Sequence, residues 1–219
     1  YTISYAGRIK VNNSIVFNKR VGGFGGVLKM ARWLKDNKIS HVIDASHPFA
    51  KRISYNTYLA CNKNNLPLVR YTRKSWIITN KDNWKTVSSY SEAANCLADV
   101  KQNVFLAIGK LNIGYFYLFS KHFYLLRMAE KTDKEILFPN YHCVIERGPF
   151  KTKDDISLLR KFKIDIIVAK NSGGSGSFSK IKAAQLLNIP IIMIDRPKLP
   201  QVKEFFSILD ILKWLNLIT

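Results

Sequence analysis

The stretch DIIVAKNSGGSGSFSK, Asp165–Lys180, indicates the fold of this chain. Its apolar first part reads as a buried strand, its middle as a glycine-rich turn, and its end opens a helical pattern. A strand, a turn and a helix in this order form the repeating unit of parallel α/β sheets. A turn that pairs Lys170 with glycines either binds an anion through backbone N–H groups or only begins a helix. Its order differs from G-x-x-x-x-G-K-[ST], so we do not expect nucleoside triphosphate hydrolysis.

The same alternation of short apolar runs and helical segments extends along the whole chain. Near-continuous apolar strands between helices are typical of parallel sheets that are covered on both faces. We therefore expect an α/β fold with two doubly wound, Rossmann-like parallel-sheet domains and a cleft between them. The N-terminal domain is expected at residues 1–76, a polar connection at 77–88 and the C-terminal domain at 89–219. The last helix is expected to cover VKEFFSILDILKWLN, residues 202–216.

Ligands of such sheets bind beyond the carboxyl ends of the strands, so the strand ends form the candidate site. These segments are richer in Gly, His, Arg and Lys than the bodies of the strands. They are AGR (6–8), DASHPFA (44–50), RYTRKSW (70–76), AIGK (107–110), ERGPF (146–150), AKNSGGSG (169–176) and DRP (195–197), and RVGGFGG (20–26) joins them before a helix.

The segment RVGGFGG places Gly22, Gly23, Gly25 and Gly26 around Phe24. The glycines either let backbone N–H groups approach an anion at a helix N-terminus, or supply the positive φ that a tight turn needs. Four glycines exceed the needs of one turn, so we favour a loop that faces a ligand. The spacing is not the dinucleotide fingerprint G-x-G-x-x-G.

The segment DASHPFA brings Ser46 and His47 next to Pro48 at an expected helix start. Ser46 or His47 can cap the helix, with proline as its first residue. Capping does not explain the histidine, which can also donate to a carboxylate or transfer a proton. Serine hydrolase chemistry is not expected, because the chain has no G-x-S-x-G turn.

Composition restricts the cellular setting. Hydrophobic residues make up 47% of the chain, which is typical of globular proteins. No apolar run reaches the roughly 20 residues that span a bilayer, and the start lacks the pattern of a signal peptide. Cys61, Cys96 and Cys143 have no metal-binding spacing and suit a reducing cytosol. We therefore expect a cytoplasmic protein without a metal centre or a membrane partner.

The net charge of +20 suits nucleic acid, an anionic membrane or an acidic small molecule as a partner. The basic residues are spread along the chain, and no block of five like charges occurs. A nucleic-acid-binding module gathers its charge on one element. We therefore favour a small polyanion and no nucleic-acid partner, with a basic nucleic-acid-binding protein as an alternative.

Several motifs, taken together, resemble the precorrin-6A reductases and cobalt-precorrin-6A reductases of cobalamin biosynthesis. The resemblance covers nearly the whole chain, and its motifs are RVGGFGG, DASHPFA, RYTRKSW, LAIGKLNI, ERGPF and KNSGGSGSFSKIKAAQLLNIPIIMIDRP, in this order. It implies an oxidoreductase that reduces precorrin-6A, or its cobalt form, to the 6B product with NADPH or NADH. Hydride passes to C19 and a proton is added at C18. The resemblance also implies an anionic tetrapyrrole as substrate, while the oligomeric state, monomer or homodimer, stays open.

One departure from the family concerns the start of the chain. YTISYAGR resembles the second strand of the family, so the first strand of the N-terminal domain is expected to be missing. A truncated, inactive homologue that still binds tetrapyrrole is therefore a further alternative.

The candidate site residues combine the strand ends with this resemblance. We assign the nucleotide to the loop that pairs a lysine with serial backbone amides before a helix; which glycine loop holds which anion stays open. The expected cofactor-binding residues are Lys170, Asn171, Ser172, Gly173, Gly174 and Gly176. The expected substrate-binding residues are Arg8, Gly22, Gly23, Phe24, Gly25, Gly26, Ser46, His47, Pro48, Phe49, Arg70, Arg73 and Arg147, with Arg20 and Lys110 adding positive charge. His47 is the candidate catalytic residue, and delivery of the proton by water or by the substrate is the alternative.

Overall fold

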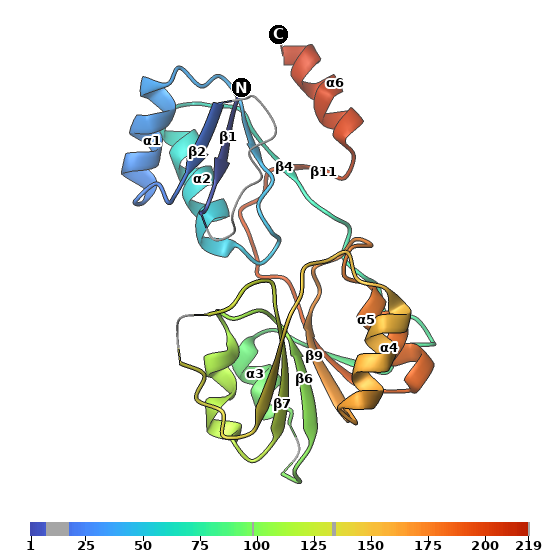
Figure 1. Ribbon diagram of the computed structural model, residues 1–219. Helices are drawn as coiled ribbons and strands as arrows, with labels where there is room; N and C mark the ends of the chain where they lie inside the picture. The colour runs from blue at the N-terminus through green and yellow to red at the C-terminus, as the bar shows by residue number, and fades with distance from the viewer. Residues whose placement is uncertain (8–17, 98, 133–134, 219) are drawn as a thin grey trace. The chain divides into compact units, whose positions relative to one another are not determined.

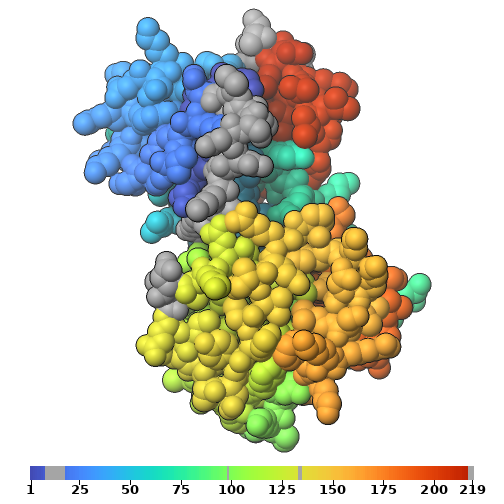
Figure 2. All heavy atoms as spheres, viewed as in Figure 1, coloured from blue at the N-terminus to red at the C-terminus, as the bar shows by residue number. Residues whose placement is uncertain are grey.

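The computed structural model describes residues 1–7, 18–97, 99–132 and 135–218. It divides into two compact units, shown in Figure 1. The first unit comprises Tyr1–Thr72 and Lys198–Thr219, and the second comprises Arg73–Pro197. In Figure 2 the red C-terminal residues accordingly lie with the blue N-terminal ones.

The second unit is built on one six-stranded sheet in the order β5-β10-β9-β6-β7-β8, and every neighbouring pair is parallel. Its strands are β5 (Trp84–Val87), β6 (Asn103–Ala107), β7 (Phe123–Met128), β8 (Tyr141–Ile145), β9 (Ile166–Lys170) and β10 (Ile191–Ile194). Its helices are α3 (Tyr90–Asn95), the 3-10 helix η1 (Ile113–Phe119), α4 (Thr152–Lys161) and α5 (Ser179–Leu187).

The central strands of this sheet are buried on both faces. Phe105 and Ile167 pack in one core layer with Ile181 of α5, and α4 and α5 lie side by side in Figure 1. Successive side chains of a strand point to opposite faces. The adjacent Leu106 and Val168 are equally buried, so the opposite face is covered too. This explains the continuous apolar runs of the sequence, and the predicted parallel α/β fold is confirmed.

The order of the strands defines a switch point. From β6 the chain continues through β7 to β8 at one edge, and then returns to β9 and β10 on the other side of β6. The order β8-β7-β6-β9-β10 thus corresponds to the doubly wound order 3-2-1-4-5, with its switch point between β6 and β9. The sixth position, beside β10, is occupied by β5, which precedes β6 in the chain.

The first unit contains two parallel sheets, a two-stranded sheet of order β1-β2 and a three-stranded sheet of order β11-β4-β3. Met30 and Leu34 of α1 pack against Cys61 of α2 in its core. The elements are β1 (Thr2–Tyr5), β2 (Asn18–Val21), α1 (Val27–Asp36), β3 (Val42–Asp44), α2 (Lys51–Lys63), β4 (Leu68–Tyr71), β11 (Lys203–Phe205) and α6 (Ile208–Ile218).

Two segments differ from the elements expected from sequence. Lys203–Phe205, placed in the last helix, form β11, and α6 begins only at Ile208. The strand is favoured because it pairs in parallel with β4, and Thr72 N–H donates to Phe205 O at 2.9 Å. This pairing places residues 198–219 in the first unit. The second difference is β5, a strand that lies inside the polar connection expected at residues 77–88. The missing first strand and the cleft stay predictions.

Candidate functional site

Two loops leave the sheet of the second unit at its switch point. One begins with Ile108 after β6, and the other comprises Asn171–Phe178 between β9 and α5. They start from neighbouring strands, because Ala107 of β6 lies opposite Ala169 of β9. The predicted nucleotide loop therefore lies where a doubly wound sheet binds its ligand.

This loop presents unpaired hydrogen-bond donors. Among the described residues, the backbone N–H groups of Gly173, Gly174, Ser175 and Gly176 donate no hydrogen bond. The φ angles of Gly173 and Gly174 are +68° and +71°. Successive free N–H groups in such turns form concavities that bind anions. At the start of α5, the buried Ser179 Oγ also lacks a partner within the described residues, and such orphan groups are rare without a ligand or water.

Asn171 fastens this loop to the rest of the unit. Its Oδ1 accepts a hydrogen bond from Trp76 N–H at 2.8 Å, and its Nδ2 donates to Trp76 O at 3.0 Å. The indole Nε1 of Trp76 donates to Gly174 O at 2.9 Å. Arg196 donates to Asn171 O at 3.0 Å and to Ser172 O at 3.1 Å. The side-chain amide of Asn171, which we assigned to the cofactor, is thus hydrogen-bonded through both its oxygen and its nitrogen and fixes the shape of the loop.

The first two glycines of the loop also allow close packing of the chain. A Cβ on Gly173 would lie 2.1 Å from Lys74 O, and one on Gly174 would lie 2.6 Å from Arg73 Cδ. A Cβ on Gly176 would meet no atom within 4 Å. Part of the glycine content is therefore explained by packing against the segment that contains Arg73, and only Gly176 stands fully open.

Two lysines lie at the base of the loop. Burial lowers the pKa of Lys170 to about 8. Burial also lowers the pKa of Lys180 to about 7, although the nearby charge of Asp155 acts in the opposite direction. Lys180 Nζ donates to Ser177 O at 2.6 Å. Sequence reasoning did not select Lys180, because a lysine in the first turn of a helix reads as an ordinary surface residue.

The loop after β8 approaches the same place. A Cβ on Gly148 would lie 3.3 Å from Gly176 O, so the ERGPF and GGSG segments meet. Arg147, expected to bind substrate, is exposed beside this contact and forms an ion pair with Glu130. The second unit thus brings together the predicted cofactor residues, Arg73 and Arg147.

In the first unit, Arg20 organises the GGFGG loop. Its guanidinium donates to Gly22 O at 2.6 Å and to Gly23 O at 2.9 Å, and lies 3.6 Å from the centroid of Phe24. The φ angle of Gly26 is +107°, and α1 then begins without a side-chain cap. The loop is held by its own arginine, while its helix N-terminus is left without a side-chain acceptor.

Asp44 and Arg70 form a buried ion pair in the first unit. The pair is 3.5 Å apart, from Arg70 Nε to Asp44 Oδ2, and Arg70 Nη1 also contacts Glu204 Oε1 at 2.9 Å. Ser46 Oγ donates to Asp44 Oδ1 at 2.5 Å. The charge of Arg70, which we assigned to substrate carboxylates, is therefore already balanced by two protein carboxylates.

The remaining predicted residues lie in the DASHPFA segment. The N-cap of α2 is Ala50, without a side-chain cap bond, so neither Ser46 nor His47 caps the helix as expected. His47 is exposed, and its Nδ1 accepts a hydrogen bond from Phe49 N–H at 3.2 Å, while Pro48 is buried. An exposed imidazole can exchange protons with solvent or ligand.

Arg8 falls outside the described residues. No described helix is both long and apolar enough to cross a membrane. A hollow that sequence reasoning did not select lies on α2, lined by Lys51, Arg52, Tyr55 and Asn56.

The sheet order gives the second unit a doubly wound α/β fold, with the glycine-rich loop at the switch point, where folds of this class bind their ligands. A family model described as "Precorrin-6x reductase CbiJ/CobK" matches residues 1–216. The chain belongs to this family of reductases, as the motifs indicated, and the predicted classes of oxidoreductase and cobalamin biosynthesis are confirmed.

Relatives of two kinds match the chain. The precorrin-6A reductase of Rhodobacter capsulatus is 38% identical over 212 residues, covering 97% of this chain and 84% of the relative. The cobalt-precorrin-6A reductase of Priestia megaterium is 32% identical over 180 residues, covering 78% and 70%. A solved structure named CobK precorrin-6A reductase superimposes with a TM-score of 0.92 at 37% identity, covering 98% of this chain and 86% of that chain.

Proposed function

We propose that this protein reduces precorrin-6A, or its cobalt form, to the 6B product with hydride from NADPH or NADH, adding hydride at C19 and a proton at C18. Family membership supports the reaction, and relatives of both kinds support either form of the macrocycle. The observation that carries the proposal is the run of free N–H groups at Gly173–Gly176 beside Lys170, at the switch point of the second unit.

The residues present fit a dinucleotide at this loop. The bound nicotinamide supplies the hydride, and the protein supplies binding and orientation. The free N–H groups of the loop would receive phosphate oxygens, Lys170 would add a cation, and Ser179 Oγ would find the partner that it lacks. The two bonds from Asn171 to Trp76 would keep these donors in place.

The macrocycle would be held through its carboxylates. Arg73 and Arg147 are exposed in the second unit. In the first unit, α1 begins after the GGFGG loop without a side-chain cap, so the backbone N–H groups at its N-terminus can donate to a carboxylate. A charge-assisted hydrogen bond contributes about 1.5–3 kcal/mol, so a few such contacts suffice to orient the ring. His47 is the candidate donor of the proton to C18, since its ring is exposed.

Turnover tests this proposal directly. The purified protein would be mixed anaerobically with precorrin-6A or cobalt-precorrin-6A and either nucleotide. We expect the nicotinamide absorbance to fall together with a change in the macrocycle spectrum. Absence of turnover with both macrocycles and both nucleotides would contradict the enzyme proposal, and binding of the macrocycle without turnover would favour an inactive homologue.

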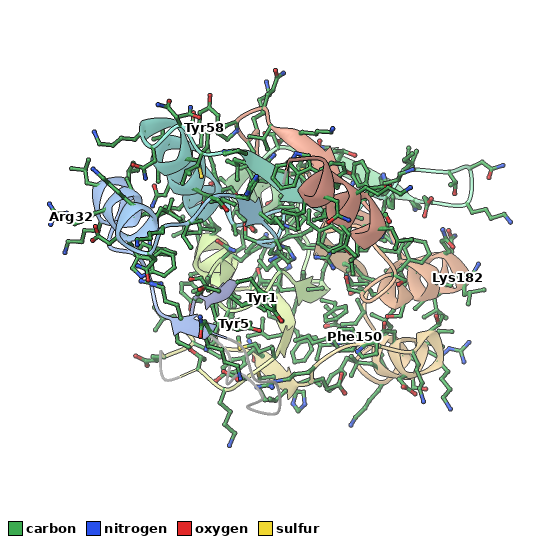
Figure 3. The ribbon with its side chains drawn as sticks, turned by 90° about the horizontal axis from the view of Figure 1, so that it is seen from above. Tyr1, Tyr5, Arg32, Tyr58, Phe150 and Lys182 are labelled. Carbon is green, nitrogen blue, oxygen red and sulfur yellow. The ribbon has the colours of Figure 1, made fainter. Side chains whose placement is uncertain are left out.

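The location of the nucleotide needs a separate measurement. Lys170→Ala should weaken NADPH binding by about tenfold or more, because one charged contact of 1.5–3 kcal/mol is lost. Lys182→Ala is the matched control, since Lys182 is an exposed lysine of α5 that points outward in Figure 3. Equal affinities of the two variants would move the nucleotide to another loop.

A further inference from the structure

The nucleotide loop is closed at its base by hydroxyl and ammonium groups. Ser172 Oγ lies 3.2 Å from Ser177 Oγ, which joins the two ends of the loop. Lys180 Nζ donates to Ser177 O at 2.6 Å from the first turn of α5. Ser172 and Lys180 are each 6% exposed, whereas Ser175 and Gly176 at the tip are exposed. The loop therefore has a buried base that contains a lysine.

The charge of Lys180 has no carboxylate of its own. The buried carboxylate near it, Asp155 of α4, is 1% exposed, and its Oδ1 lies 2.5 Å from Arg127 Nη2 of β7. Glu146 also pairs with Arg127, at 3.5 Å, rather than with Lys180. Among the described residues, Lys180 Nζ donates its only hydrogen bond to a neutral carbonyl.

Other neighbours of Lys180 are cationic or aromatic. Lys170 of β9 and Arg127 both act on it as like charges. Its ammonium lies 5.1 Å from the ring centroid of Trp76. The guanidinium of Arg127 in turn lies 4.4 Å from the centroid of Phe150, which is labelled in Figure 3. Two cations and one carboxylate thus act on the charge of Lys180, and that carboxylate already pairs with Arg127.

We propose that Lys180 is a positioning residue of the nucleotide loop: it closes the loop through Ser177 O, and its buried ammonium stabilises a phosphate bound to the free N–H groups. This inference rests on the proposed nucleotide site and adds a partner that the sequence did not identify. A buried cation without its own carboxylate is costly, and an anion at the loop would offset that cost.

Proton uptake is the expected signature. Burial lowers the pKa of Lys180 to about 7, so near neutral pH part of the protein holds the amine uncharged. A bound phosphate favours the charged form and raises this pKa, so binding takes up a proton at and above pH 7. Affinity should then fall as pH rises, by up to about tenfold per pH unit for one group. Lys170, with a pKa of about 8, contributes at higher pH.

Calorimetry measures both quantities. NADPH would be titrated into the protein from about pH 6.5 to about pH 9, in two buffers with different heats of ionisation, so that proton uptake is counted. In Lys180→Met, uptake near pH 7 should disappear and affinity should fall by about tenfold. Lys180→Arg keeps a permanent cation and should restore affinity without the uptake. Lys182→Met, from the outer surface of the same helix, should behave as wild type.

The outcomes separate this inference from the proposed function. If Lys180→Met and Lys182→Met bind NADPH with equal affinity and equal proton uptake, the role of Lys180 is wrong while the nucleotide site stands. If neither NADPH nor NADH binds the wild-type protein, both proposals are wrong. Should Lys180→Met not fold, the wild-type titration decides, because binding without proton uptake over the whole pH range contradicts the inference.

Discussion

The substitution Gly173→Ala tests why the nucleotide loop contains glycine. The φ angle of Gly173 is +68°, and its new Cβ would lie 2.1 Å from Lys74 O and 2.5 Å from Arg196 Nη2. The left-handed conformation costs alanine about 1–2 kcal/mol. Forcing a methyl group into packed surroundings costs about 1–3 kcal/mol more. We therefore expect the second unit to lose about 2–5 kcal/mol of its free energy of unfolding.

Gly176→Ala is the matched control, three residues along the same loop. Its Cβ would meet no atom within 4 Å, so we expect a change within about 0.5 kcal/mol. Urea unfolding would be followed by tryptophan fluorescence, because Trp76 and Trp84 lie in the second unit. If Gly173→Ala unfolds at the same urea concentration as Gly176→Ala, the close approach of Lys74 does not determine the residue at this position.

Three further predictions concern buried polar groups. Asn171→Asp keeps an acceptor for Trp76 N–H but turns a second oxygen toward Trp76 O. This variant and Asn171→Ala should each destabilise the second unit by about 1–3 kcal/mol in urea unfolding. An unchanged midpoint for Asn171→Asp would contradict the assigned hydrogen bonds. Arg70→Met leaves Asp44 buried without its cation, so the first unit should lose about 3–5 kcal/mol, and a loss below about 1 kcal/mol would show that the pair is dispensable. Because burial lowers the folded-state pKa of Lys180 from 10.5 to about 7, the unfolded state binds more protons between these pH values. The free energy of unfolding of the second unit without ligand should therefore rise with pH across this window, and the rise should be smaller in Lys180→Met; equal slopes would refute the shift.

The sequence predicted those features that depend on local pattern. The apolar run before Lys170 indicated a buried strand, and the glycines after it indicated a turn that either binds an anion or begins a helix. Because ligands of parallel sheets bind beyond the carboxyl ends of the strands, we predicted a ligand at this loop, and the strand order puts the loop at the switch point of the sheet.

Long-range pairings could not be predicted in the same way. Arg70 pairs with Glu204, which is 134 residues away in the sequence. We predicted that Arg70 binds a ligand because it stands at a strand end, but its charge is balanced within the protein. Lys203–Phe205 looked helical because the residues after them are, yet pairing with β4 makes them a strand. The burial of Lys180 depends on how α4, β7 and β9 meet around it, and no local pattern records that.

The return of the C-terminal segment to the first unit has a consequence for folding during synthesis. The second unit is continuous in sequence, from Arg73 to Pro197, whereas the sheet of the first unit receives β11 from the C-terminal segment. Domains fold as units while the chain emerges at about 5–20 residues per second. The second unit can therefore fold from one uninterrupted segment, while the earlier-made first unit must wait for β11. A polypeptide that ended at Pro197 would keep every strand of the second unit, but β4 of the first unit would pair with β3 alone and would lack β11.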